Sequence, residues 1–348
     1  LPASPLALLA LGIGRKNAVA LDWRSLPRQA PALFAYWRAS LPASLETIVP
    51  LWSELVSEAV PRHAALIAAA GADALIRRDG YWEVHGGEAT LAAAALQAER
   101  RRQRYGVAFT VADRAALARS EPALRTSMAG AIHWTGPWTC RAPGELVGAY
   151  ARLFEKAGGR IETGDARSLA PSGTGWRVAG QEVEHVVVAL GPWSPDLVKR
   201  FGYHVPMVRK RGYHRHLAGD LGLRRPMLLA DHSVVLSPMQ AGLRIATAAH
   251  LSDAPPVAVP RQLMRGEAVA RALLDLGAPV EAAAWSGTRP CLPGMLPLVC
   301  RAREHAGLWF HFGHGHQGFT LAPVTAERLA RAIDGDAAAI EGLARGVT

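Results

Sequence analysis

The feature that most constrains the fold is a glycine-rich segment near the C-terminus, LWFHFGHGHQGFTLAP at residues 308–323. An apolar run, predicted to be a strand, leads into Gly313, Gly315 and Gly318, and a helical pattern follows from about residue 321 to 333. The spacing is G-x-G-x-x-G in the strand–loop–helix setting of a dinucleotide fingerprint. That fingerprint also needs a second strand ending in an acid about 20 residues later, whereas only the tail 333–348 follows here. We therefore predict that the helix N-terminus faces a partly negative ring edge rather than a pyrophosphate; a tight turn without ligand is the alternative.

A second segment, HVVVALGPWSPDLVKRFG at residues 185–202, has the pattern of a strand that ends at a ligand. The β-branched run at 182–190 predicts a parallel strand buried on both faces. Gly191 follows this strand, and Ser194 with Pro195 predicts the start of a short helix. Because α/β folds bind ligands at the carboxyl ends of parallel strands, Gly191 would let a flat cofactor approach the backbone. Many strand-to-helix turns share this pattern, so alone it is weakly specific.

Two further segments carry candidate substrate-binding side chains. Arg289 lies in WSGTRPCLPGMLPLV at 285–299, a stretch otherwise poor in charge. The local sequence leaves open whether its guanidinium pairs with an internal carboxylate or binds an anionic ligand in a bidentate manner. The alternating strand RGYHRH at 211–216 puts Tyr213 on one face and His214 on the other. One face lines a polar cavity or is exposed to solvent, and both interpretations stay open.

Three histidines lie close together in the glycine-rich segment, at His311, His314 and His316. No cysteine or acid joins them at ligand spacing, so we expect no metal site. Neither G-x-S-x-G nor H-E-x-x-H occurs, which removes the usual anchors of a hydrolase.

Charge and cysteine content narrow the class further. The net charge of +10 comes mostly from arginines spread along the 348 residues, so we expect no nucleic-acid binding. The three cysteines form no C-x-x-C, which favours a reducing compartment without a disulfide framework. No apolar stretch reaches 18 residues, so no transmembrane helix is predicted.

The order of the predicted elements indicates two lobes. Residues 1–71 have a helical pattern, which Pro50 and Pro61 would start, kink or split. Asp79-Gly80 predicts a hairpin, 143–157 a helix, and RIET at 160–163 a strand. Most of 203–250 has the pattern of antiparallel strands. Helix–strand alternation in two patches around an antiparallel block predicts an α/β nucleotide-binding lobe interrupted by an α+β lobe.

Taken together, these segments resemble the D-amino-acid oxidase superfamily of FAD-dependent oxidoreductases, and within it the D-amino-acid dehydrogenase branch. The resemblance is carried by HVVVALGPWSPDLVKRFG, VRKRGYHRHL, WSGTRPCLPGMLPLV and GLWFHFGHGHQGFTLAPVTAERLARAI, in the family's order. It extends more loosely to GYWEVH, ARSEPAL and APGELVGAYARLFEKAGGRIE. It implies an α/β fold in which a Rossmann-like FAD-binding lobe comprises a helical segment 1–75 with 137–202 and 286–340. It also implies an α+β substrate-binding lobe, 76–136 with 203–285, built on a mixed and largely antiparallel sheet.

The resemblance assigns roles to individual residues. It implies that Arg289 binds the substrate carboxylate and that Tyr213 or His214 lines the substrate cavity. It implies FAD contacts at the two glycine turns, made by Gly191, Trp193, Gly313, Gly315, His316, Gln317, Gly318, Phe319 and Thr320.

The activity that it implies is oxidation of the Cα–N bond of a D-amino acid or related secondary amine. A hydride passes from Cα to flavin N5, and the imino acid is hydrolysed to a 2-oxo acid and an amine. A quinone or carrier is the expected electron acceptor. The expected location is the cytoplasm, with peripheral attachment to the inner membrane as an alternative.

The sequence departs from the family at its start. The opening strand, its G-x-G-x-x-G and the ribose-binding acid are not found, and the GIG at 12–14 follows no strand. We expect that about 30 residues or more of the nucleotide unit are missing, which makes the Rossmann-like lobe truncated. A flavin-free, non-catalytic remnant or binding module of the same fold is therefore the alternative function.

Overall fold

The computed structural model of the chain describes residues 19–125, 127–219 and 222–344. The helices of this part are α2 (Leu26–Arg38), α3 (Pro42–Ala69), α4 (Glu88–Tyr105), α5 (Arg114–Ser120), α6 (Pro143–Lys156), α7 (Ser194–Val198), α8 (Arg261–Leu273) and α9 (Gly318–Ile333). The GIG at 12–14 lies outside the described residues.

The largest sheet has ten strands and is mixed. Its order is β1 (Val19–Leu21), β15 (Ala249–Leu251), β11 (Val208–Leu217), β14 (Gly242–Ala246), β13 (Val234–Met239), β12 (Met227–Leu229), β3 (Tyr81–His85), β5 (Gly130–Trp134) and β4 (Phe109–Asp113), and β16 (Trp285–Cys291) also pairs with β11. Only β1–β15 and β12–β3 are parallel pairs. The antiparallel block predicted for 203–250 therefore contributes β11, β12, β13, β14 and most of β15 to this sheet.

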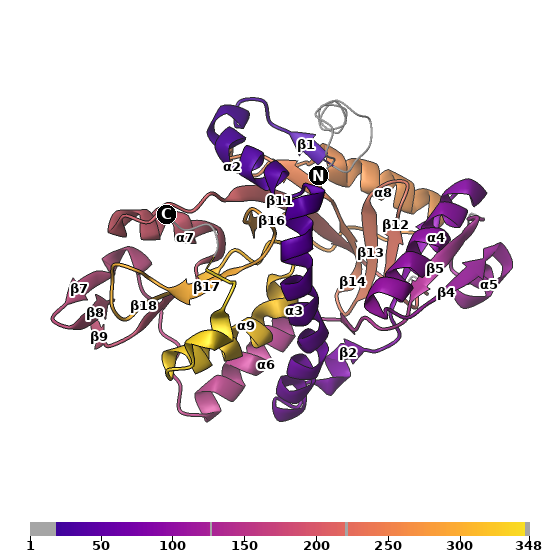
Figure 1. Ribbon diagram of the computed structural model, residues 1–348. Coiled ribbons are helices and arrows are strands. Elements are labelled where there is room, and N and C mark those ends of the chain that lie inside the picture. The colour runs from indigo at the N-terminus through magenta and orange to yellow at the C-terminus, as the bar shows by residue number, and fades with distance from the viewer. Residues whose placement is uncertain (1–18, 126, 220–221, 345–348) are drawn as a thin grey trace.

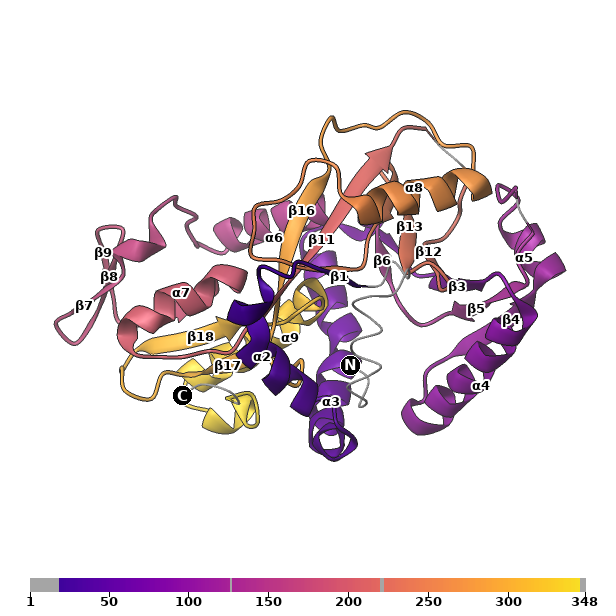
Figure 2. The ribbon, with the colours of Figure 1, turned by 90° about the horizontal axis from the view of Figure 1, so that it is seen from above.

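Three smaller sheets complete the described strands. One has the order β10 (Val186–Val188), β18 (Leu308–Phe312) and β17 (Leu298–Arg301). Another pairs β2 (Ile76–Arg77) with β6 (Thr139–Cys140), and the last joins β7 (Ala170–Ser172), β8 (Gly175–Val178) and β9 (Gln181–Val183). Helices α3 and α9 pack on each other and lie between the ten-stranded sheet and the small sheet β10–β18–β17 (Figures 1 and 2).

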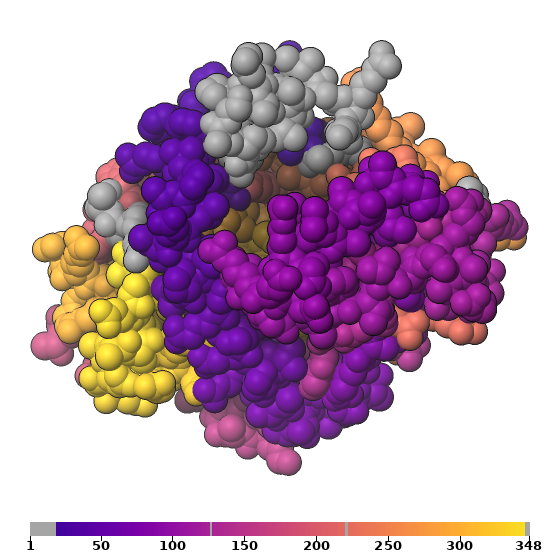
Figure 3. Space-filling model, turned by 45° about the vertical axis from the view of Figure 1, so that its right-hand side comes forward, coloured from indigo at the N-terminus to yellow at the C-terminus, as the bar shows by residue number. Residues whose placement is uncertain are grey.

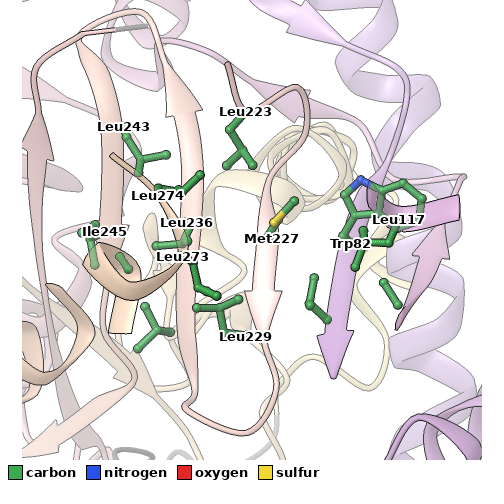
Figure 4. Close-up of a cluster of buried hydrophobic side chains, with 14 of the residues drawn as sticks. Trp82, Leu117, Leu223, Met227, Leu229, Leu236, Leu243, Ile245, Leu273 and Leu274 are labelled. Carbon is green, nitrogen blue, oxygen red and sulfur yellow. The ribbon is translucent and has the colours of Figure 1, made fainter. Parts of the chain in front are cut away.

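The core of the large sheet forms where α8 covers it. Leu236 of β13 and Ile245 of β14 are fully buried, and they pack with Leu273 at the end of α8 (Figure 4). Alternate residues of β13 and β14 supply this apolar face, which leaves the opposite face of β14 free for polar side chains.

The prediction of one strand over 182–190 is wrong, because two strands of different sheets occupy that range. β9 belongs to the small hairpin sheet, and β10 pairs in parallel with β18. The parallel pairing was predicted, but burial on both faces was not correct, since Val187 is 40% exposed. No described strand lies on the second edge of β10.

Residues 160–163 were predicted to be a strand, and they form none. Ile161 is 58% exposed, because no described strand lies beside it to complete a ladder. A β-branched pattern alone gives no strand without a neighbour to accept its hydrogen bonds.

The hairpin predicted around Asp79-Gly80 is also wrong. β2 pairs with β6, whereas β3 pairs with β5, so the two flanking strands belong to different sheets. Gly80 has φ +72, and a Cβ there would lie 1.9 Å from the carbonyl oxygen of Trp134. The glycine is required by this close approach of β5 rather than by a hairpin turn.

From residue 19 onward the N-terminal region is mostly helical as predicted, in α2 and α3, except that β1 was not foreseen, and residues 1–18 lie outside the described residues. α3 continues through Pro50 and Pro61 without a break. Both prolines are exposed, while Leu55 and Ala59 on another side are buried in the contact with α9. Packing of that face therefore stabilises the helix against the hydrogen bonds that the prolines remove.

We expect Leu236→Ala to lower the free energy of unfolding by about 2–5 kcal/mol, because it opens a cavity in the α8-covered core. Leu96→Ala in α4 is the matched control, since that leucine is 54% exposed and its truncation should change stability by no more than about 0.5 kcal/mol. Denaturant titration measures both. Equal losses for the two variants would contradict this placement of the core.

Candidate active site

The glycine-rich loop between β18 and α9 docks against the end of β16. The N–H of Gly315 donates to the carbonyl oxygen of Pro290 at 2.8 Å, and His314 forms an isolated antiparallel bridge with Cys291. Gly313 and Gly315 have φ +84 and +60, and a Cβ on Gly313 would lie 2.3 Å from a methyl carbon of Leu292. Glycine is therefore required for the loop to lie beside the strand that carries Arg289.

The N-terminus of α9 follows this loop directly. Gln317 is its N-cap residue and provides no side-chain cap, while the N–H of Leu321 donates to the Gln317 carbonyl. Among the described residues, no acceptor meets the N–H groups of Gly318, Phe319 and Thr320. These three donors and the helix dipole suit a group that carries partial negative charge.

His63 of α3 fixes the first turn of α9, a contact that no sequence pattern predicted. Its Nε2 lies 2.9 Å from the carbonyl oxygen of Phe319, and its Nδ1 lies 3.0 Å from the hydroxyl of Tyr150. Because a carbonyl only accepts, Nε2 carries the proton and Nδ1 accepts from the tyrosine. The ring also stacks on Phe319, with centroids 5.5 Å apart. Three residues distant in sequence thus hold the helix end in place.

Two of the three neighbouring histidines lie beneath the loop. The Nε2 atoms of His311 and His314 lie 2.9 and 3.0 Å from the hydroxyl oxygen of Thr325, which itself donates to the Leu321 carbonyl. Burial lowers the pKa of His311 to about 4 and that of His314 to about 3, so both rings are neutral at neutral pH. In the part of the chain that the structure describes, no group of three histidines, cysteines or acids is arranged to hold a metal.

His316 lies in a different environment from His311 and His314. Burial, together with the charges of Arg289 and Lys210, lowers its pKa. This places His316 on the side of the loop that faces the ten-stranded sheet.

Because His311 and His314 are buried in their neutral form, we expect the free energy of unfolding to fall in acid. An unfolded histidine titrates near the model value of 6.5, whereas His311 and His314 titrate at about 4 and about 3 in the folded chain. The unfolded state therefore binds protons first as the pH falls, so stability present above pH ~6.5 is lost progressively toward pH ~4 and below. We expect the melting temperature to drop across this range and His314→Gln to reduce the slope.

His204→Gln is the control, because His204 is exposed and should leave the slope unchanged. A melting temperature that is flat from pH ~7 to pH ~4 would show that the pair is not buried in its neutral form.

The turn after β10 meets the same edge as the loop. Since β10 and β18 are parallel, Gly191 and Gly313 both follow the carboxyl ends of neighbouring strands. Gly191 has φ +56 and begins a short 3-10 helix that ends at Trp193, which is 70% exposed. Arg209 of β11 donates to the carbonyl oxygen of Pro192 at 3.1 and 3.2 Å, which ties this turn to the large sheet.

Arg289 projects from β16 over the neighbouring strand. A Cβ at Gly212 of β11 would lie 2.6 Å from its Nη2, so the guanidinium covers that glycine. It donates to the carbonyl oxygens of Ala248 at 2.8 Å and Thr247 at 3.4 Å. Among the described residues no carboxylate pairs with it, and burial lowers its pKa. The sequence left two interpretations of Arg289 open. For the first of them, pairing with an internal acid, the described chain offers no candidate.

The register of β11 separates Tyr213 from His214. His214 lies opposite Trp285, and their rings stack with centroids 4.5 Å apart on the face that carries Arg289. Burial, followed by the charge of Arg244, lowers the pKa of His214 to about 4. Tyr213 projects from the other face, is buried, and its hydroxyl lies 3.2 Å from Nδ1 of His250. Only His214 of this pair therefore shares a face with Arg289.

The fold is mixed α/β with a large mixed sheet, and comparison with known proteins defines its class. The model of the family "FAD dependent oxidoreductase" matches residues 20–332. The chain belongs to this family of FAD-dependent oxidoreductases, which includes amino-acid oxidases and dehydrogenases, and the family's cofactor is FAD.

Individual relatives are distant. The chain is 25% identical over 329 residues to a D-amino-acid oxidase of Bradyrhizobium diazoefficiens, a match covering 91% of this chain and 77% of that protein. It is 32% identical over 264 residues to a D-amino acid dehydrogenase of Cereibacter sphaeroides, covering 70% of this chain and 58% of that protein. Its fold is similar to glycine oxidase from Bacillus cereus, with a TM-score of 0.67, 22% identity and 82% of each chain covered.

The residues present fit the flavin end of FAD. The positive-φ glycine Gly191 has no neighbouring atom within 4 Å of its Cβ position and so leaves backbone open to a flat ring, and the first turn of α9 offers N–H groups to the ring's partly negative edge. For the ADP end, the described residues hold no second G-x-G-x-x-G besides the one at 313–318. No described helix combines the length and hydropathy needed to cross a membrane.

Because the described residues fit the flavin end of FAD and not its ADP end, we can predict the relative affinities of the 348-residue chain for FAD and riboflavin. If its contacts are confined to the flavin end, FAD and riboflavin should bind with dissociation constants within about threefold of each other, a difference below about 1 kcal/mol. Fluorescence titration with each flavin measures this. FAD bound more than about tenfold tighter would show that the chain contacts the ADP half as well.

Proposed function

We propose that the chain oxidises the Cα–N bond of a D-amino acid or a related secondary amine. The product is an imino acid, which water converts to a 2-oxo acid and an amine. One observation carries the proposal: an arginine without an acid partner, Arg289, is held beside the glycine loop and the open N-terminus of α9.

Arg289 would bind the substrate carboxylate. The carbonyl oxygens of Ala248 and Thr247 hold its guanidinium in one orientation, which leaves the rest of the fork for a ligand. A guanidinium fixed in this way pairs with a carboxylate through two parallel hydrogen bonds. Because Gly212 has no Cβ, the guanidinium can lie over the strand at that position, and its pairing with the carboxylate contributes orientation to the reaction.

His214 would form a neutral wall of the site. Its pKa of about 4 keeps the ring uncharged at neutral pH, so it adds no positive charge next to an amine. A substrate amine that binds in its neutral form needs no strong base, and the site offers none on this face. Tyr213 is not part of this proposal, because it projects from the other face of β11.

FAD, when bound, supplies the two-electron acceptor chemistry. The N–H groups of Gly318, Phe319 and Thr320 would stabilise the negative charge that comes with reduction. We assign the sheet β10–β18–β17 with α3, α6 and α9 to the FAD-binding lobe, and its Rossmann-like character remains part of the proposal. The D-configuration follows the relatives' activities, and a quinone or carrier is the proposed acceptor.

The role of Arg289 is tested in flavin-loaded protein. A charge-assisted pair contributes about 1.5–3 kcal/mol, so Arg289→Ala should lower kcat/KM about ten- to a hundredfold. Arg289→Lys should recover only part, because an ammonium cannot form the bidentate fork. The decisive comparison is an amino acid against its decarboxylated amine, in wild type and variant. We expect the variant to lose activity on the amino acid alone.

A structural role for Arg289 predicts a different pattern. Equal losses on both substrates, or a large drop in melting temperature, would show that the guanidinium stabilises the fold through Ala248 and Thr247 instead. Complete inactivity of flavin-loaded wild type on all amino acids and amines would favour the non-catalytic alternative.

A further inference from the structure

A second arginine, Arg244, projects from the same face of the large sheet as Arg289. Arg244 of β14 lies directly opposite His216 of β11, and Arg289 of β16 lies directly opposite Lys210. Positions 210 and 216 are separated by an even number of residues, so these side chains share one face. His214 lies between them on that face.

Arg244 has no acid partner among the described residues. No hydrogen bond or ion pair joins its guanidinium to them, and its Nε is buried without an acceptor. Burial lowers its pKa. Glu281 is near enough to act on His214, but both of its oxygens are engaged by the N–H and ring of His216. A buried cation in this position costs folding free energy until an anion meets it.

Most of the other half-buried arginines among the described residues pair with acids, the exception being Arg77 of β2, which donates to the carbonyl oxygen of Arg224. Such pairs are Arg215–Glu267 at 3.4 Å, Arg225–Asp79 at 3.2 Å, Arg209–Asp196 at 2.9 Å, and Arg328 with Glu54 and Glu58 at 2.6 Å each. Arg211 also lacks an acid, but it projects from the opposite face with Tyr213. Arg244 and Arg289 are therefore the two unpaired arginines on the face with His214.

The interval between the two guanidinium groups is bordered by small residues. Arg289 covers Gly212, and Ala246 lies opposite His214. Position 216 lies four residues beyond Gly212, and this step corresponds to about 13 Å along the strand. Arg244 lies opposite His216, two positions along this face from His214.

Helices α3 and α9 lie beside this sheet (Figures 1 and 2), and His63 of α3 holds the carbonyl of Phe319 at the start of α9. Figure 3 shows the surface hollowed between the indigo N-terminal segments and the purple segments. Atoms from later segments of the chain are visible inside this hollow.

We propose that Arg244 binds a second anionic group at the far end of the substrate, so that the preferred substrate is an amino acid with a side-chain carboxylate. This rests on the proposed function, because Arg289 must hold the α-carboxylate. The two arginines then act as a pair of anchors, with the reacting Cα near Arg289 and the side-chain carboxylate near Arg244. An uncharged side chain of equal length would leave Arg244 unpaired and bind more weakly.

The first test compares D-glutamate with D-glutamine on the FAD-supplemented full chain. Wild type should prefer D-glutamate, and Arg244→Gln should lower kcat/KM for D-glutamate about ten- to a hundredfold while changing D-glutamine less than about twofold. Arg177→Gln is the matched control, since Arg177 is exposed on β8 and should change neither. Arg244→Gln should not lower the melting temperature, because it removes an unpaired buried charge.

The second test needs no turnover. Calorimetry with glutarate and butyrate should show tighter binding of glutarate to wild type, and Arg244→Gln should abolish that preference while Arg244→Lys keeps part of it. Equal binding of the two acids to wild type, or a preference that survives Arg244→Gln, overturns the proposal. Oxidation of D-glutamine without any preference for D-glutamate refutes the role of Arg244 and does not contradict the proposed function. A glutarate preference that depends on Arg244, in a protein that oxidises no amino acid, sustains the anion site and refutes the reaction.

Discussion

The structure depends on one backbone contact, the hydrogen bond from the N–H of Gly315 to the carbonyl of Pro290. It joins the loop at the carboxyl end of the small parallel pair to the last residues of a strand from the large sheet. Through it, the segments that carry the open N–H groups of α9, His316 and Arg289 adjoin one another. Only a residue without Cβ fits beside Leu292 and Met295 in this loop, so the glycines fix the site's geometry as much as its charged residues do.

Around this contact, one set of polar groups has hydrogen-bond partners, and another set of charged groups has no acid partner. Thr325 binds both buried histidines, and His63 donates to the carbonyl of Phe319 in the first turn of α9, so the support of the loop is hydrogen-bonded. On the facing sheet, Arg289 and Arg244 have no acid, although arginines elsewhere in the chain do. Buried cations without partners lower stability, and proteins keep such groups mainly where a ligand completes them. The imbalance is therefore a physical argument for anionic substrate groups at this face.

The sequence predicted what local pattern determines. Helix α6 begins at Pro143 and ends near the paired glycines as expected, and the side chain of Asp113 caps α5 by accepting from Ala116 N–H at 2.7 Å. The strand–loop–helix around Gly313 and the parallel character of β10 were also predicted. These elements follow from capping, periodicity and backbone freedom within a few residues.

The sequence could not predict what non-local contacts decide. His63 gave no signal because its partners Tyr150 and Phe319 are far away in the chain. The choice between Tyr213 and His214 needed the strand register, since a one-residue shift exchanges the two faces. Residues 160–163 had the composition of a strand but found no neighbouring strand in the described chain. Each error reflects a partner that local pattern does not contain.

The central claim is that this loop and this arginine together hold an amino acid for oxidation. The most direct measurement mixes FAD-loaded chain with a D-amino acid without oxygen and follows the absorbance of the oxidised flavin. The account predicts loss of that absorbance with one 2-oxo acid formed per flavin, and little loss with the L-enantiomer. Absorbance that stays unchanged with every D-amino acid and secondary amine tried, in protein shown to hold flavin, would contradict it.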